Sequence, residues 1–411
     1  MASSATVTSA GARRNKGDGQ GKGTIRLSEQ QQQQQQPGDE LQRDPIEHQH
    51  KDFFWTYTEE PHRTRRLAII KAHPEVTKLC GPEPLTKYVV LLVVSIQVFC
   101  AYLLRDAAFF SPRFWALAYV VGATANQNLF LAIHEISHNL AFRSPTANRL
   151  FAIVANLPIA VPYSASFRPY HLTHHKSLGV DGLDTDLPTA FEAVVLDSVL
   201  GKAFFCTFQI FFYALRPMCV YSVPFTWVSA VNVAVQLSFD ALVLRLLGTQ
   251  SLLYLLLSSF LAGSLHPTAG HFIAEHYVYE TVTPEQRDPG RGIPVPETFS
   301  YYGPLNVLTY NVGLHNEHHD FPAVPWTRLP RLRQIADEFY RDLPQHKSWV
   351  HVIWQFIFDE NVGMRCRVKR SEGGRLVGQG PACQGRKDKA QAQAPVQKAA
   401  VADWKADELE A

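Results

Sequence analysis

The sequence of 411 residues is poor in cysteine, and the cysteines it has are widely spaced. The six cysteines stand at positions 80, 100, 206, 219, 366 and 383, without a CxxC pair. This spacing argues against a disulfide-rich scaffold and against a zinc or iron–sulfur site built on thiolates. An excess of positive charge is also missing, because 39 Lys and Arg face 37 Asp and Glu. The balance argues against a nucleic-acid binder, which needs a basic face.

The first residues carry neither a secretory nor a lipidation signal. No apolar run follows Met1, so we expect no cleavable signal peptide, and Ala2 in place of glycine argues against N-myristoylation. Residues 1–50 contain the glutamine run Gln30–Gln36 and few apolar side chains, which predicts a disordered leader. Residues 364–411 are basic and rich in alanine and glutamine, and we expect a second disordered segment there.

The apolar side chains gather between these two ends, in runs that suit a membrane. Tyr88–Leu104 and Phe114–Ile133 are separated by a short loop, and each approaches the roughly 20 apolar residues that a spanning helix needs. Phe225–Leu247 and Ser251–Leu265 form a second such pair. The sequence therefore predicts an all-α membrane protein with four transmembrane helices in two hairpins, within a membrane domain at residues 88–363.

Two further apolar segments are expected to lie at the membrane interface or inside the protein. Leu150–Val161 is too short to span, since spanning helices need about 20 residues. Ala203–Tyr221 is interrupted by Arg216 and Pro217, so we place it in the interface. Residues 51–87 mix aromatic and basic side chains, which is typical of a segment at the membrane surface.

Basic residues flank the predicted spans on both sides. An even number of spans places both flanks, and both termini, in the cytosol, as the positive-inside rule prefers. The flanking residues are Arg63, Arg65, Arg66, Arg365, Arg367, Lys369 and Arg370.

Histidine is the residue in excess, with 17 in the chain. Eight of them form one HxxxH and two HxxHH groups, and residues three or four apart on a helix share one face. With four spans, all three groups fall on the cytosolic side. The groups are His134 and His138; His171, His174 and His175; and His315, His318 and His319.

Eight converging imidazoles are more than one tetrahedral zinc ion takes, which is four ligands. The count of eight imidazoles therefore favours two metal ions. Imidazole suits iron and copper as well as zinc. A zinc-dependent membrane hydrolase or receptor would need only three or four such ligands. A catalytically silent membrane scaffold would not need the groups at all.

The stretches around these histidines resemble a known family. HEISHNLAF, HLTHHKSLGVDGLDTDLPT and YNVGLHNEHHDFP carry the histidine boxes, and DFFWTYTEEPHRTRRLAIIKAHPEV and HPTAGHFIAEHYVY accompany them. Together they are similar to the sphingolipid Δ4-desaturases (dihydroceramide desaturases), within the membrane fatty-acid desaturase superfamily. The similarity extends from about Asp52 to Met364, while the glutamine-rich leader and the basic tail depart from it.

The resemblance implies a cytosolic cap in which the eight box histidines bind two iron ions. It also implies a ninth ligand between the last span and the third box, for which His271 is the first candidate and His266 and His276 are alternatives. Acidic residues near the boxes are candidates for orienting the imidazoles. They are Glu135, Asp184, Asp186, Glu317 and Asp320.

The implied reaction is O2-dependent trans-desaturation of dihydroceramide (N-acylsphinganine) between C4 and C5, giving ceramide. The alternative is a sphingolipid C4-hydroxylase, or a bifunctional enzyme, that forms phytoceramide. His266 and Pro267 begin like the haem motif HPGG, but Thr268 and Ala269 replace its glycines. The resemblance to the desaturase family implies separate electron donors, cytochrome b5 and its NADH-dependent reductase. It also implies a multi-pass location in the endoplasmic reticulum membrane.

Overall fold

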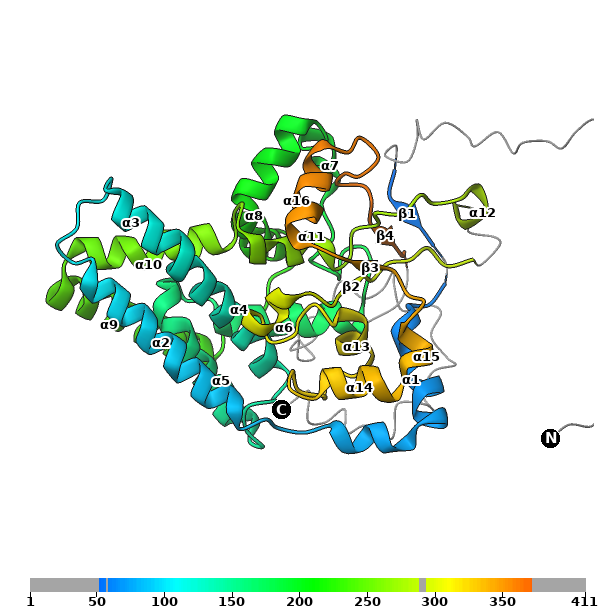
Figure 1. Ribbon diagram of the computed structural model, residues 1–411, viewed down its shortest axis with the longest axis horizontal. Coiled ribbons are helices and arrows are strands. Elements are labelled where there is room, and N and C mark those ends of the chain that lie inside the picture. Colours follow the sequence, from blue (N-terminus) through cyan, green and yellow to red (C-terminus); the bar gives the residue numbers. More distant parts are fainter. Residues whose placement is uncertain (1–51, 57, 288–292, 372–411) are drawn as a thin grey trace, which may run out of the picture. The chain divides into compact units, whose positions relative to one another are not determined.

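The computed structural model describes residues 52–56, 58–287 and 293–371 (Figure 1). The predicted leader at residues 1–50 and most of the predicted tail lie outside these ranges. The described part is mainly helical, as expected, and its few strands pair in parallel. In chain order its helices and strands are β1 (Phe54–Trp55), α1 (Pro61–Ala72), η1 (Pro74–Leu79), α2 (Leu85–Leu103), α3 (Pro112–Leu117), η2 (Ala118–Ala123), α4 (Thr124–Ser137), α5 (Pro145–Asn156), η3 (Leu157–Ile159), α6 (Ser164–Lys176), α7 (Ala190–Val195), α8 (Val199–Val220), α9 (Trp227–Leu247), α10 (Thr249–Ala262), η4 (Pro267–Gly270), α11 (His271–Ala274), α12 (Pro284–Arg287), β2 (Ser300–Tyr301), η6 (Pro304–Leu308), α13 (His315–Asp320), α14 (Leu329–Ile335), α15 (Asp337–Tyr340), β3 (Gln345–His346), α16 (Trp349–Phe358) and β4 (Val368–Lys369).

Four of the long apolar segments, α2, α3 with α4, α9 and α10, gather in one bundle at the left of Figure 1, whereas α8 packs against α16. In it, α10 contacts α2, α4 and α9, and α2 contacts α4. Gly248 links α9 to α10 with a φ of +86°, in the left-handed region that glycine adopts without a steric penalty. The four apolar runs of the two predicted hairpins pack together in this bundle. The bundle therefore supports the histidine boxes.

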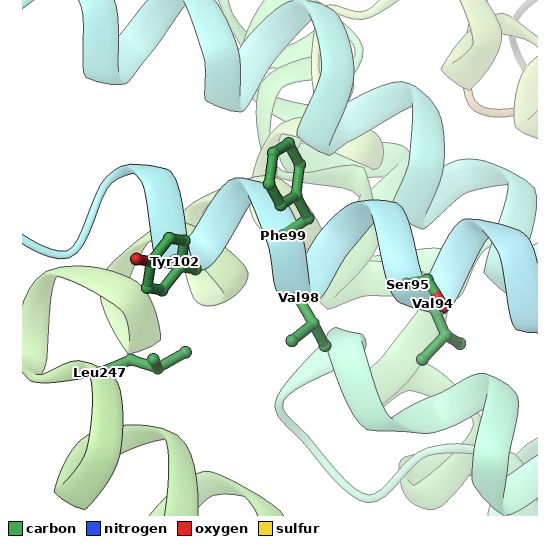
Figure 2. A pocket seen from close by; sticks show the side chains of 6 residues that line it. All are labelled: Val94, Ser95, Val98, Phe99, Tyr102 and Leu247. Carbon is green, nitrogen blue, oxygen red and sulfur yellow. The ribbon is translucent and has the colours of Figure 1, made fainter.

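The outer face of the bundle is apolar, as a membrane protein requires. On α2, Leu92 and Phe99 are 60% and 57% exposed, and on α9 Leu237 and Leu246 are 59% and 67% exposed. Large exposed apolar surfaces of this kind mark contact with lipid or with another protein. A shallow apolar groove on this face is lined by Val94, Ser95, Val98, Phe99, Tyr102 and Leu247 (Figure 2).

More helices could span a membrane than the four that the sequence predicts. Among the described residues, five helical segments are long and apolar enough to cross a membrane. The additional one is α8, which we expected in the interface, while α5 with η3 and α6 form a pair bent by 115°. Several long apolar helices make this a multi-pass membrane protein, and the arrangement of four spans in two hairpins stays a prediction.

A small set of polar side chains ties α4 into the bundle. Asn126 on α4 donates a hydrogen bond to Ser259 on α10 at 2.8 Å. Gln97 on α2 donates to the carbonyl of Gly122 at 2.9 Å and accepts from Tyr254 at 2.6 Å. Buried polar groups that are fully paired specify one packing arrangement. These bonds therefore set the position of α4, whose far end carries the first histidine box.

The two ends of the described part meet beside the histidine boxes. β1 pairs with β4 in the register Phe54 with Val368, so the chain stays folded beyond residue 363, where we expected the disordered tail to begin. Arg370, which we expected among the flexible basic residues, is 5% exposed and donates to Glu297 at 2.7 Å. Its guanidinium also donates to the carbonyl of Leu178 at 3.1 Å, just after the second box.

Replacing Arg370 with alanine tests whether this C-terminal strand is part of the fold. The change leaves the buried carboxylate of Glu297 without its partner, and breaking a buried ion pair costs about 3–5 kcal/mol. We expect a clear drop in the thermal unfolding temperature of the detergent-solubilised chain. The half-buried pair of Arg365 with Asp197 is the control, since Arg365→Ala should cost no more than about 1 kcal/mol. Equal effects of the two variants would contradict this description.

Candidate metal centre

The first histidine box lies where α4 ends. His134 is in the last turn of α4, and His138 directly follows the helix. Asn139 then takes a φ of +61°, which stops the helix at this point. The rings of His134 and His138 are 5.3 Å apart, so both face the same region.

The second and third boxes lie on α6 and α13. On α6, His171 and His175 are four residues apart and share a face, whereas His174 is turned about 100° from His175 around the helix axis. On α13, His315 and His319 share a face and His318 points to another side. Each HxxHH box can therefore serve two separate points in space.

Five histidines from all three boxes form the first set. His138 Nε2 lies 2.8 Å from His171 Nε2, which lies 3.1 Å from His175 Nε2. His175 Nε2 lies 3.2 Å from His318 Nε2. One ring nitrogen from each member lies within 4.8 Å of the others, and the members are His134, His138, His171, His175 and His318.

Four histidines form the second set, with His276 at its middle. His276 Nε2 lies 3.1 Å from His174 Nε2 and 2.9 Å from His315 Nε2. The ring of His276 is 4.8 Å from that of His319, and the nitrogens of His174, His276 and His319 lie within 4.8 Å of one another. The eight box histidines and His276 thus divide into groups of five and four.

The first candidate for the ninth ligand, His271, lies outside both sets. Its Nδ1 is 2.8 Å from Glu275 Oε1, and its Nε2 faces the side-chain amide of Gln127. His266 precedes His271 by five residues, and its Nδ1 is 2.7 Å from Thr268 Oγ1. The structure therefore places the alternative His276, rather than His271, among the box histidines.

Burial keeps most of the imidazoles outside the membrane helices uncharged. The exception is His174, for which burial lowers the pKa but the carboxylates of Asp184 and Asp186 outweigh it and raise the pKa to about 9. Desolvation, reinforced by His174 and the other nearby histidines, lowers the pKa of His315 to about 4 despite the opposing charge of Glu275. Burial likewise lowers the pKa of His276, His318 and His319 well below the ordinary value. A metal binds only deprotonated histidine, so these side chains are in the ligand form at neutral pH.

The spacing of the nitrogens fits metal ions. Bonds of about 2.0–2.1 Å from a metal to imidazole put neighbouring donors about 3 Å apart and opposite donors about 4 Å apart. The separations of 2.8–3.2 Å between Nε2 atoms match the first of these values. His319 Nε2 is buried without a hydrogen-bond partner among the described residues, which a metal would satisfy. The donor set is all nitrogen, which suits iron, copper or zinc.

Of the acidic residues that the sequence analysis selected, Asp184 clearly orients a box histidine. Its Oδ1 lies 2.9 Å from His174 Nδ1, and its Oδ2 accepts from the backbone N–H of Gly179 at 2.7 Å. Burial opposes ionisation, but His174 and Arg367 hold the pKa of Asp184 below its ordinary value. Asp186 is also near, with Oδ2 3.6 Å from His174 Nδ1. Carboxylates in this position fix the orientation of a ligand imidazole.

The other three selected acids contact different partners. Glu135 accepts from the backbone N–H of Trp326 at 3.0 Å. Glu317 accepts from Tyr302 at 2.8 Å, and burial raises the pKa of Glu317 to about 6. Asp320 lies 2.7 Å from His62 Nδ1. These three position backbone and neighbouring side chains of the boxes rather than the box imidazoles directly.

Sequence reasoning missed two residues beside the second set. Glu275 Oε1 lies 2.8 Å from His271 Nδ1 and 3.7 Å from His315 Nδ1, and its position next to His276 was an available signal. His62 is 4% exposed, and its ring is 4.8 Å from that of His319. His62 lies 253 residues before the third box in the sequence, so no short motif relates the two.

Comparison with known proteins identifies the family of the chain. Residues 110–351 match the fatty acid desaturase family, and residues 49–85 match the family described as sphingolipid Delta4-desaturase. The chain belongs to the sphingolipid Δ4-desaturase family. It is 56% identical to the sphingolipid delta(4)-desaturase of Schizosaccharomyces pombe over 82% of this chain and 92% of that protein.

Two further relatives show how far the similarity extends. The sphingolipid delta(4)-desaturase of Komagataella phaffii is 60% identical over 78% of this chain and 88% of its own length. The sphingolipid delta(4)-desaturase/C4-monooxygenase of Homo sapiens is 46% identical over 78% of this chain and 95% of its own. Membership of this family makes the chain a desaturase, and therefore an oxidoreductase. The zinc hydrolase and the silent scaffold are excluded as readings of the histidine boxes.

Variants of His276 and His271 distinguish the two candidates for the ninth position. We expect His276→Ala to lower desaturase turnover at least as much as loss of a box histidine does, because the second set has only four imidazoles. His271→Ala removes the same ring nearby and should retain most of the turnover. The measurement is product formed per milligram of membrane-inserted protein. If His271→Ala lost turnover and His276→Ala kept it, His271 rather than His276 would be the ligand.

Proposed function

We propose that this desaturase converts dihydroceramide (N-acylsphinganine) to ceramide by trans-desaturation between C4 and C5 at a di-iron centre. The observation that carries the proposal is the division of nine histidines, seven of them buried and His171 and His175 partly buried, into two separate sets. One ion takes about four to six ligands, so the two sets suit two ions better than one. The family to which the chain belongs supplies the reaction class, and its relatives' names supply the sphingolipid and the Δ4 position.

The proposed ligands follow the two sets. One iron is held by the first set and the other by the second, with His276 in place of His271. Asp184 orients His174 and keeps its Nε2 directed at the second set. The proposed ligands are His134, His138, His171, His174, His175, His276, His315, His318 and His319.

The chemistry explains why histidines rather than an acid–base pair line the site. The C–H bonds at C4 and C5 are unactivated, so a side-chain base cannot remove their hydrogens. When bound, the reduced iron pair supplies the O2-dependent oxidation that removes two hydrogens. The chain's own residues hold the imidazoles in place, and their burial keeps bulk water away.

The proposed setting is the endoplasmic reticulum membrane, with both termini in the cytosol. We propose four spans, α2, α3–α4, α9 and α10, with α8 lying in the interface. Support for the place of α8 comes from Arg216, which is buried and pairs with Glu192 at 2.8 Å, because a charged pair is costly in the centre of a bilayer. Residues 88–363 are then the membrane desaturase domain and residues 51–87 an N-terminal lipid-desaturase segment, between a leader and a tail.

The proposed electron donors are cytochrome b5 and its NADH-dependent reductase. The reaction consumes O2 and two electrons beyond those taken from the lipid. The replacement of the HPGG glycines by Thr268 and Ala269 supports a donor supplied by a separate protein.

C4-hydroxylation is a second candidate activity. It is favoured by one observation, the name of the human relative, which couples Δ4-desaturase with C4-monooxygenase. Both reactions begin with removal of hydrogen from the same part of the lipid, so one site can serve both.

Product analysis tests the proposal directly. We expect the full chain, expressed in a yeast that makes no Δ4-unsaturated sphingolipid and fed short-chain dihydroceramide, to form ceramide with a trans C4–C5 bond. Mass spectrometry with mapping of the double bond is the measurement. His174→Ala, which removes one proposed ligand, is the inactive control. Phytoceramide as the sole product would contradict the desaturase assignment. Formation of neither ceramide nor phytoceramide from the added dihydroceramide would contradict the substrate class.

A further inference from the structure

His62 lies at the edge of the second histidine set, although it belongs to a distant part of the chain. It is the second residue of α1, and α1 packs against α13. Glu60 caps the start of α1 by accepting from the backbone N–H of His62 at 2.7 Å. The His62 ring is 4.8 Å from that of His319, tilted by 36°, so the two imidazoles pack against each other.

Both nitrogens of His62 are occupied by the protein, which decides what the residue can do. Nδ1 is 2.7 Å from Asp320 Oδ1, and Nε2 is 2.8 Å from Thr298 Oγ1. A histidine needs a free ring nitrogen to bind a metal. His62 is therefore not a tenth ligand but a bridge between the two segments that carry ligands of the second set.

One side of the bridge is the end of α13. Asp320 is fully buried and directly follows His319, and Arg65 donates to both of its oxygens, from Nε at 2.7 Å and from Nη2 at 3.0 Å. Arg65 Nη2 also donates to Asn316 at 2.8 Å. A buried carboxylate needs such partners because an unpaired charge inside the protein is costly. His62 and Arg65 thus tie α1 to the third box.

The other side of the bridge reaches His276. Thr298 Oγ1, which contacts His62 Nε2, lies 3.4 Å from His276 Nδ1. The carbonyl of the preceding residue, Glu297, is 3.1 Å from the same Nδ1. The orientation of His276 is therefore connected, through Thr298, to the same imidazole that packs on His319.

We propose that His62 is a positioning residue of the second metal site. It bridges Asp320 and Thr298, and so holds His319 and His276 in the orientation that lets both bind one ion. The inference rests on the proposed metal centre. It gives α1, which lies within the segment expected at the membrane surface, a role in metal retention.

The test measures iron directly, on purified full-length chain in detergent. Wild type, His62→Ala and His62→Gln are titrated with an iron chelator, and bound iron is counted by mass spectrometry. We expect His62→Ala to lose half of its second iron at a chelator concentration about 10-fold to 100-fold lower than wild type needs. A loss of this size is usual when a residue that hydrogen-bonds to a metal ligand is removed. Glutamine can donate to Asp320 and accept from Thr298, so His62→Gln should recover much of the loss.

His73→Ala is the matched control. This histidine ends α1 and contacts Glu338 at 2.6 Å on the surface, so its removal should leave iron retention unchanged. If His62→Ala does not fold, Thr298→Val removes the hydroxyl that contacts His62 Nε2 while keeping the shape of the side chain, and it should also weaken iron retention. Because both changes break the same bridge, the double variant should lose less iron retention than the sum of the two single losses.

Two results would overturn the role of His62. One is equal iron retention in His62→Ala and wild type, and the other is fully additive loss in the double variant with Thr298→Val. A wild-type chain that binds no iron would instead refute the proposed metal centre. The two failures are therefore distinguishable in the same titration.

Discussion

The constraint on which the structure depends is the convergence of nine imidazoles from four separate parts of the chain. Neighbouring Nε2 atoms approach to 2.8–3.2 Å, which two charged rings would oppose and which a shared metal ion would stabilise. Burial disfavours a charge on such rings, and so the site depends on the side chains that shield the imidazoles from water.

Three of the four parts that carry ligands are each held by a buried polar contact. Asn126 fixes α4 in the apolar bundle, Asp184 ties the end of α6 to the loop that follows it, and Asp320 anchors α13 through His62 and Arg65. These contacts join segments that are 100 or more residues apart, except for that of Asp184. Such long-range contacts leave the ligands little freedom, which is what a site of defined geometry requires.

The sequence predicted the helical character, the apolar runs and the eight box histidines, because those features are local and periodic. It could not choose between His271 and His276, since both follow α10 closely and only the turn after α11 decides which ring faces the boxes. The contacts of His62 with Asp320, and the pairing of Phe54 with Val368, join distant segments that no local pattern relates. The basic side chain of Arg370 looked like part of a solvated tail, and only its buried partner Glu297 shows otherwise.

The most direct test of the account is metal analysis combined with iron-edge X-ray absorption on the purified full-length chain. The account predicts two iron ions per chain, bound by nitrogen and oxygen donors without sulfur, and a change in the iron–nitrogen signal on His276→Ala. Zinc in place of iron, a single ion per chain, or a signal that His276→Ala leaves unchanged would contradict the division of nine histidines into two iron sites.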